Sequence, residues 1–408
     1  MSDNLPIDAL IDILSRLPVK SVVRFTCICK QWYSLITNPN FISTHLKKTL
    51  LNSNNNNNNN NNDDQLLLVR HYNMFDETEL FALYLDNELF DKYVELECPF
   101  RSVKEYFRIV GSCNGLICLS DDYDTFTDTI IIWNPSVRRS VTLPKPQFPY
   151  TSEGACLMGF GCDAFNNDYK VVRIVYQYYS PDDHNYRVPP NVEVYSLSTG
   201  TWRNLGVATP TYIVYNFFAL PAFVNGAVHW VASDWGDKGS FHNVVATFDM
   251  GDEVFGDIMM PDSVAKTEVL KLSISVLGTS LALVQYEKIW QSEYCWVWMM
   301  EEYGVAESWT RLFTIDMREG IRKVVGFQRN NEVLLSARVR GLISHAPNTQ
   351  RTVYLGIHGT NRSFYVDNYV ESLVLLKRNR ALYAANSCDD GEGESCVHAV
   401  EDGTEKQQ

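Results

Sequence analysis

The side chains that could do covalent chemistry do not stand at spacings that support it. The 408-residue sequence contains no GxSxG, HExxH, GxGxxG or phosphate-loop pattern. Cys388 and Cys396 lie among acidic residues, and neighbouring negative charge disfavours the thiolate that a nucleophile needs. His229 alternates within an apolar run, which indicates a packed, hydrogen-bonded core histidine. We therefore predict no catalytic residue and a protein that is not an enzyme.

Metal ligands and cofactors are not indicated either. The ten cysteines include no CxxC pair and no Cys/His series at zinc spacing, so we expect reduced thiols and neither a metal nor a cofactor. The acidic run with Asp121, Asp122, Asp124 and Asp128 lacks the spacing of a calcium loop, and we predict a solvated turn there.

Charge is unevenly distributed along the chain. The whole sequence has a net charge of −14, which argues against nucleic acid as a partner. Residues 1–50 nevertheless contain six basic and three acidic residues, which suggests an acidic partner for this segment. No apolar run approaches the ~18 residues of a membrane span, and the first residues do not resemble a secretory signal. We therefore expect no membrane partner and a location in the cytoplasm, the nucleus or both.

Short helices are predicted for residues 1–50. Apolar residues repeat at the spacing of one helical face, namely Leu10, Ile13, Leu14 and Leu17. Pro18 ends this helix, because the residue before a proline avoids the α region. A helical module of this size buries little apolar surface, so we expect it to need a neighbour for stability.

Two segments lack the composition of a folded element. Residues 51–65 include nine consecutive asparagines, and we predict a flexible tether there. Residues 381–408 are strongly acidic, and we predict a disordered tail.

The sequence between 66 and 380 is typical of short strands. The pairs Asn114-Gly115 and Asn225-Gly226 predict tight hairpins, because both central positions of that turn need positive φ. Glycine-flagged turns alternate with aromatic strands at a period of roughly 50 residues, the spacing of kelch-like blades. We predict an α+β multidomain chain, in which the helices precede a β-propeller-like domain of about six irregular blades. A pair of β-sandwiches is the alternative.

Both parts of the chain resemble known families. The N-terminal segment resembles an F-box, since the motif elements follow in order without a gap: Leu5-Pro6, Leu17-Pro-Val-Lys-Ser21, Arg24-Phe25 and Cys29-Lys-x-Trp32. The β segment resembles the F-box-associated domain of the large plant F-box family, through phrases such as Gly111-Ser-Cys-Asn-Gly-Leu-Ile-Cys118 and Trp133-Asn-Pro-Ser136.

The resemblance implies a substrate-recognition subunit of an Skp–cullin–F-box ubiquitin ligase. The helices would bind an Skp-type adaptor and, through it, a cullin–RING ligase, while the β domain would capture a protein target for ubiquitination and degradation. Such a subunit acts by raising the effective concentration of the target, which needs no catalytic group. A protein-binding propeller that engages no ligase is the alternative. A copper enzyme of the galactose-oxidase type is disfavoured, because the eight histidines are scattered along the sequence.

Candidate contact residues follow from the two resemblances. Those for the adaptor are Leu5, Pro6, Leu10, Ile13, Leu17, Pro18, Val19, Lys20, Ser21, Val22, Phe25 and Trp32. For Phe25 and Trp32, packing between helices is an equal alternative. We expect a target surface in the aromatic segments 176–190 and 212–218, because tyrosine and arginine are enriched at interfaces. The candidates there are Tyr178, Tyr179, Tyr186, Arg187, Tyr212 and Tyr215, and irregular loops are the other interpretation.

Overall fold

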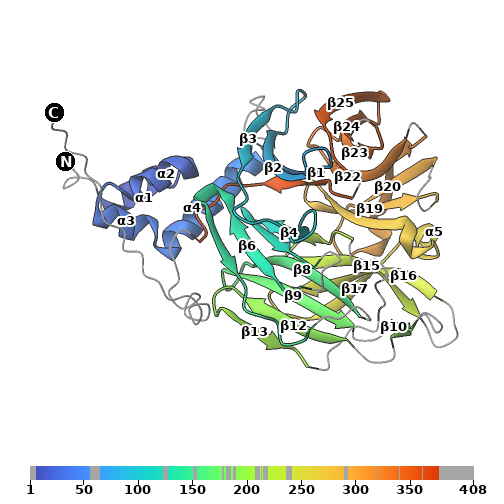
Figure 1. The fold of residues 1–408 in the computed structure, drawn as a ribbon, viewed down its shortest axis with the longest axis horizontal. Coiled ribbons are helices and arrows are strands. Elements are labelled where there is room, and N and C mark those ends of the chain that lie inside the picture. Colours follow the sequence, from blue (N-terminus) through green and yellow to red (C-terminus); the bar gives the residue numbers. More distant parts are fainter. Residues whose placement is uncertain are drawn as a thin grey trace, which may run out of the picture. The chain divides into compact units, whose positions relative to one another are not determined.

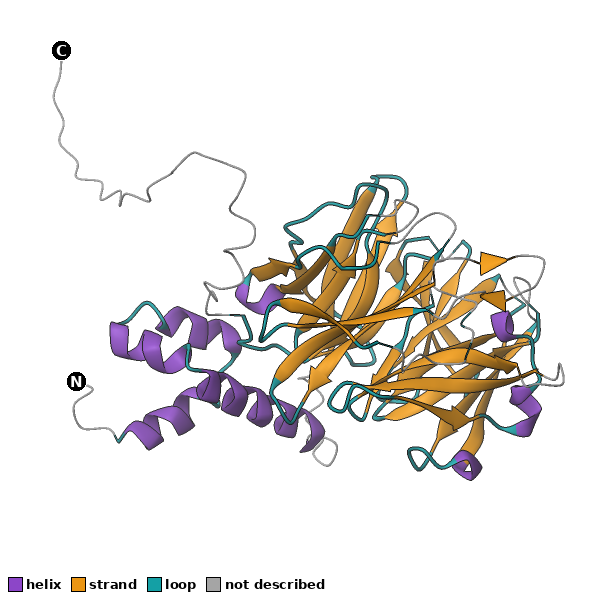
Figure 2. Cartoon of the chain, turned by 90° about the horizontal axis from the view of Figure 1, so that it is seen from below, coloured by secondary structure: helices purple, strands orange, loops and turns teal. Residues whose placement is uncertain are grey.

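The structure is a computed structural model, and residues 1–378 form one compact unit in it. It describes residues 6–55, 65–122, 127–149, 154–176, 179–180, 185–186, 190–206, 212, 214, 219–235, 241–288, 293–318, 320–339, 341–360 and 362–375. The described N-terminal segment is helical, and strands dominate the rest (Figure 2).

The helical module consists of α1 (Ile7–Leu14), α2 (Val19–Phe25), α3 (Lys30–Ile36) and α4 (Pro39–Asn55). Pro6 and Pro18 directly precede α1 and α2, with φ of −56° at both positions. The prediction of helices is confirmed. Helix α4 continues to Asn55, so the first five residues of the segment predicted as a tether are helical. Adding residues to an existing helix does not require the costly formation of a first turn, which explains why α4 continues beyond residue 50.

The core of this module is completed by the β domain. Leu14, Val19, Val22, Ile36 and Phe41 are buried together with Val137 and Leu373, which belong to the β domain. The need for a neighbour, expected from the small size of the module, is thus met at least in part within the chain.

Six four-stranded antiparallel sheets form the blades of the propeller. Blade 1 contains β26 (Tyr365–Tyr369), β1 (Leu66–Asn73), β2 (Thr78–Leu85) and β3 (Lys92–Leu96). Blade 2 contains β4 (Arg108–Cys113), β5 (Leu116–Ser120), β6 (Ile130–Asn134) and β7 (Arg139–Thr142). Blade 3 contains β8 (Ala155–Asp163), β9 (Asp168–Tyr176), β12 (Asn191–Ser196) and β13 (Thr201–Asn204).

The remaining blades repeat this order, with the first strand innermost. Blade 4 contains β14 (Ala222–Val224), β15 (Ala227–Trp235), β16 (Phe241–Asp249) and β17 (Phe255–Met259). Blade 5 contains β18 (Leu272–Leu277), β19 (Ser280–Tyr286), β20 (Tyr294–Met300) and β21 (Trp309–Asp316). Blade 6 contains β22 (Ile321–Phe327), β23 (Val333–Ala337), β24 (Gly341–Ala346) and β25 (Arg351–Ile357). Short elements between them are η2 (Pro135–Val137), β10 (Tyr179–Ser180), β11 (Asn185–Tyr186), α5 (Asp262–Ala265), η3 (Val269–Lys271) and η4 (Ala306–Ser308).

The ring is closed by a strand pair that is distant in sequence. The last described strand, β26, pairs with β1, with Leu66 opposite Tyr369 and Arg70 opposite Tyr365 (Figure 1). Closure pairs two strands that would otherwise present free edges to other chains, and each blade keeps one outer edge. A propeller of six blades is thus confirmed, and the alternative of paired β-sandwiches is wrong.

Local sequence signals explain the turns and the blade contacts. Asn114 and Gly115 have φ of 50° and 80°, and Asn225 and Gly226 have 51° and 80°, so both predicted hairpins are confirmed. Gly159 lies on β8 where blade 3 meets blade 4, and a Cβ there would stand 2.6 Å from Val228 Cγ1. This position therefore requires glycine for close packing of the two blades.

The antiparallel order assigns every turn to one of two rims. The near rim holds the β4–β5 turn at Asn114-Gly115 and the β6–β7 turn at η2, whose Val137 contacts the helical module. The far rim holds the β1–β2 turn and the connections that lead from one blade to the next, such as β25–β26. The described residues of the predicted target segments 176–190 and 212–218 belong to connections of the far rim.

Candidate protein-binding sites

The surface of the helical module carries exposed apolar side chains. Among the predicted adaptor contacts, Pro6, Pro18 and Lys20 are exposed, and Ile13 is 50% exposed. Half-buried positions are Leu10, Leu17, Ser21, Phe25 and Trp32. Val19 and Val22 are buried in the core and offer no surface to a partner, and Leu5 lies outside the described residues.

Sequence reasoning missed several exposed apolar side chains of this module, among them Leu51 of α4, which is 58% exposed. Ile7 and Ile28 are each 58% exposed, and Tyr33 is 49% exposed. The rings of Phe25 and Trp32 meet edge to face with centroids 5.4 Å apart, so packing between helices occupies part of their surfaces. An exposed position at the end of an apolar helical stripe was the signal that could have identified Ile7.

The charges of the module leave its basic residues largely exposed. Asp12 accepts hydrogen bonds from Lys48 and Arg16, and these bonds hold the pKa of its carboxyl below the usual value. Lys20, Arg24, Lys30 and Lys47 remain exposed. This surface suits an acidic partner, as the sequence suggested.

The last described residues of the chain, around 372–374, are hydrogen-bonded to blade 2 next to the helical module. The fully buried Asn134 donates from Nδ2 to Ser372 O (3.1 Å) and Val374 O (2.8 Å), and its Oδ1 accepts from Ser136 N (2.9 Å). Leu373, between these two acceptors, is the residue that enters the core of the module. Asn134 of the Trp-Asn-Pro motif thus holds the C-terminal segment at the contact between module and propeller.

The residues considered for catalysis or metal binding have structural partners. His229 is buried, with Nδ1 3.1 Å from Ala222 O and Nε2 2.9 Å from the Tyr303 hydroxyl. Burial lowers its pKa to about 4, as for a packed neutral histidine. In the described part of the chain the cysteines are free, and no three His, Cys, Asp or Glu residues are grouped to hold a metal.

The solvated turn predicted for the acidic run is wrong. Asp121 and Asp122 are buried: Asp121 accepts from Ser102 Oγ (2.7 Å), and Asp122 pairs with Arg108 (2.9 Å). Asp128 pairs with Arg173 at 2.9 Å, and Asp124 lies outside the described residues. The carboxylates have separate partners, which sequence spacing alone could not indicate.

The predicted target residues lie only partly within the described chain. Tyr179 and Tyr186 are backbone register partners in the β10–β11 pair, whereas Tyr178, Arg187 and Tyr215 lie outside the described residues. Tyr212 is half-buried and donates to Asp257 Oδ1 at 2.7 Å, and burial raises the pKa of its hydroxyl. The Tyr176 hydroxyl donates to Tyr212 O (3.4 Å), and Tyr176 shares one hydrophobic cluster with Tyr212 and Val214, so the described residues of the two segments meet.

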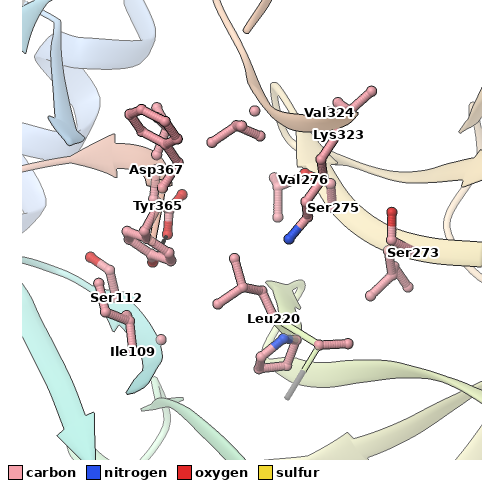
Figure 3. Close-up of a pocket in the computed structure, with 18 of the residues that line it drawn as sticks. Ile109, Ser112, Leu220, Ser273, Ser275, Val276, Lys323, Val324, Tyr365 and Asp367 are labelled. Carbon is pink, nitrogen blue, oxygen red and sulfur yellow. Dashed lines mark hydrogen bonds between the residues drawn. The ribbon is translucent and has the colours of Figure 1, made fainter. Parts of the chain in front are cut away.

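A central cavity of about 1220 Å³ lies between the innermost strands (Figure 3). Its wall combines apolar residues such as Ile109 and Leu220 with serines 112, 273 and 275 of the innermost strands. Seven basic and two acidic residues line it, which is the reverse of the balance in the whole chain: Arg70, Arg108, Lys288, Arg322, Lys323, Arg338 and Arg362 against Glu105 and Asp367. Sequence reasoning did not predict this site.

Comparison with known proteins identifies both parts of the chain. Residues 65–377 match the model of the F-box associated beta propeller domain, and residues 2–44 match the F-box domain. The chain belongs to the F-box-associated β-propeller family. This F-box protein is 29% identical over 392 residues to F-box protein CPR1 of Arabidopsis thaliana, a match that covers 91% of this chain and 89% of the relative.

Two other Arabidopsis thaliana relatives also match most of this chain. An F-box/kelch-repeat protein is 26% identical over 320 residues, covering 76% of this chain and 79% of the relative. Another F-box protein is 27% identical over 404 residues, covering 89% and 90%. An F-box joined to this propeller supports a role as a substrate receptor in Skp–cullin–F-box ligases. Among the described residues, no helix has the length and apolarity needed to cross a membrane.

Proposed function

We propose that this F-box protein is the target-recognition subunit of an Skp–cullin–F-box ubiquitin ligase, in the cytoplasm, the nucleus or both. The helical module docks an Skp-type adaptor, and the far rim of the propeller holds a protein target for ubiquitination and degradation. The protein contributes proximity and no catalytic group, since binding the target beside the ligase raises the local concentration of its lysines.

The observation that carries this proposal is the exposure of apolar side chains on helices whose core is already complete. Val137 and Leu373 fill the inner face of the module, so Ile7, Ile13 and Ile28 are not needed for packing within the described chain. Exposed apolar groups together with exposed cations indicate a protein interface for an acidic partner. Because Val19 and Val22 are buried, the proposed adaptor surface excludes them.

The adaptor surface is tested by co-purification of the full chain with an Skp-type adaptor. We expect Ile13→Asp to abolish the stable complex, because it places an unpaired charge in an apolar interface. The matched control is Val254→Asp on the β16–β17 turn, since Val254 is 56% exposed and should leave the complex intact. No complex with the parent chain would instead favour the propeller that engages no ligase.

The target face is tested with two phenylalanines of matched exposure on opposite rims. Phe75, in the β1–β2 turn of the far rim, is 92% exposed, and Phe165, in the β8–β9 turn of the near rim, is 95% exposed. We expect Phe75→Asp to change the set of proteins labelled by a proximity ligase fused to the chain, and Phe165→Asp to leave it unchanged. The reverse result would place the target on the near rim.

A further inference from the structure

The basic character of the central cavity is concentrated at the far rim. Arg70 and Arg108, deeper in the wall, have structural partners: Arg70 pairs with Glu79 (3.4 Å) and donates to Phe107 O (2.9 Å), and Arg108 pairs with Asp122. The other five basic residues, of which Lys288, Arg322 and Arg362 also make interactions within the chain, come from the far-rim ends of blades 5 and 6 and from the β25–β26 connection: Lys288, Arg322, Lys323, Arg338 and Arg362. They define what we call the basic mouth.

Lys323 is a cation of the basic mouth whose side chain enters the cavity (Figure 3). It lies on β22, half-buried, and its ammonium points into the cavity (Figure 3). It forms no hydrogen bond or ion pair within the part of the chain that the structure describes. Burial lowers the pKa of Lys323, and repulsion from Arg70 adds to this effect. A charge held in this position without a counterion is costly to the fold, which points to a ligand that supplies one.

A backbone irregularity directs two neighbouring cations to the same space. Successive side chains of a regular strand point to opposite faces. The pairing of β22 with β23 shifts register between Ile321 and Lys323, and both Arg322 and Lys323 line the cavity. Bulges commonly re-aim side chains at functional sites.

Few acidic groups of the wall compete for these cations. Asp367, on the neighbouring β26, accepts from the Tyr365 hydroxyl and from Asn368 N, both at 2.8 Å, and burial raises its pKa to about 6. Glu105 is exposed. The Thr360 hydroxyl, on the β25–β26 connection, also lines the cavity and has no hydrogen-bond partner among the described residues. Among the described side chains that line the mouth, basic groups therefore outnumber acidic ones.

We propose that the basic mouth binds an acidic, extended segment of the target protein, with Lys323 holding a carboxylate or phosphate group of that segment and Arg338 contacting the next. This inference rests on the proposed function, because it names the chemistry of the target that the far rim receives. Val339 is 85% exposed and Leu270 is 47% exposed beside the mouth, so apolar residues next to the acidic ones are accommodated. Interfaces of this kind combine charge complementarity with an apolar contact.

The test measures binding of labelled peptides to the full-length protein by fluorescence anisotropy at physiological salt. The probes are a glutamate-rich peptide, its glutamine twin, and a serine peptide with and without phosphorylation. We expect the glutamate or the phosphoserine peptide to bind at least about tenfold more tightly than its neutral twin. Which of the two binds more tightly then distinguishes carboxylate from phosphate as the recognised group.

Substitutions of Lys323 test whether the acidic peptide binds at the basic mouth. We expect Lys323→Met to weaken acidic-peptide binding about tenfold and Lys323→Arg to preserve it. The control is Arg351→Gln, which removes an exposed cation from the near-rim end of the same blade and should leave binding unchanged. Lys323→Met should also keep or raise the melting temperature, because it removes a partly buried charge, so a loss of binding cannot be attributed to unfolding.

Three outcomes would overturn the proposal. The first is equal binding of the acidic peptides and their neutral twins. The second is equal weakening by Lys323→Met and Arg351→Gln, which would indicate long-range charge alone. The third is a much higher peptide affinity for a chain ending at Arg378, which would assign the mouth to the acidic run 389–408 of this sequence. A normal adaptor complex with any of these results would leave the proposed function standing and remove only this inference.

Discussion

Replacing Asn134 by alanine should loosen the joint between the propeller and the helical module. Asn134 is fully buried, and its amide bonds to two backbone carbonyls of the C-terminal segment and to the backbone N–H of Ser136. Alanine leaves all three backbone groups without this partner. A buried polar group without a hydrogen bond costs about 1–3 kcal/mol, and two of these three sites are only partly buried. We therefore take about 1 kcal/mol for each group and expect a loss of about 3 kcal/mol in the free energy of unfolding.

Urea unfolding followed by tryptophan fluorescence measures this loss, as a shift of midpoint at constant slope. The control is Asn348→Ala, because Asn348 is exposed in the β24–β25 turn and should change stability by less than about 0.5 kcal/mol. If Asn134→Ala behaved like this control, the three hydrogen bonds would not hold the segment, and our account of the joint would be refuted.

Three further changes test other parts of the fold. Gly159→Ala should destabilise by about 1–3 kcal/mol, since its Cβ would press on Val228 between blades 3 and 4; an unchanged urea midpoint would contradict this. Glu193→Ala should cost about 3–5 kcal/mol, because it leaves the buried guanidinium of Arg173 without its fully buried partner, and thermal unfolding measures the loss. His229 has its pKa lowered from 6.5 to about 4, so as pH falls through this range the unfolded chain takes up a proton that the folded chain does not. Stability should therefore fall by up to about 3 kcal/mol across this window, and His229→Gln should flatten that part of the profile in urea titrations at several pH values.

Local patterns in the sequence predicted the architecture well. The Asn-Gly pairs identified hairpins because positive φ at two successive positions leaves few other residue types, and the blade period followed from repeated turn chemistry. The partner of β1 could not be read in this way, because β26 lies almost 300 residues further along the chain and strand pairing leaves no local signal. The burial of Val19 and Val22 depends similarly on Val137 and Leu373, which are distant in sequence.

The same distinction between local signals and contacts that are distant in sequence applies to the candidate sites. Ile13 of α1 lies on the apolar stripe that the helical period indicated, although Ile7 was missed, whereas the basic mouth depends on a register shift in β22 that period-two alternation cannot reveal. Its cations are also contributed by four separate stretches of the chain. The predicted solvated turn at Asp121 failed for the same reason, since Ser102 and Arg108 reach these carboxylates from another loop and strand.

The way in which the ring closes has a consequence for how this receptor can change its target. Strand β1 begins and β26 ends at the near rim, where the helical module also makes contact. Far-rim loops other than the β1–β2 turn and the β25–β26 connection can therefore lengthen without touching either the closing strand pair or the joint with the module. The entropic cost of a longer loop grows only with the logarithm of its length. Longer far-rim loops should thus cost little stability, while the contacts between the helical module and the propeller stay unchanged.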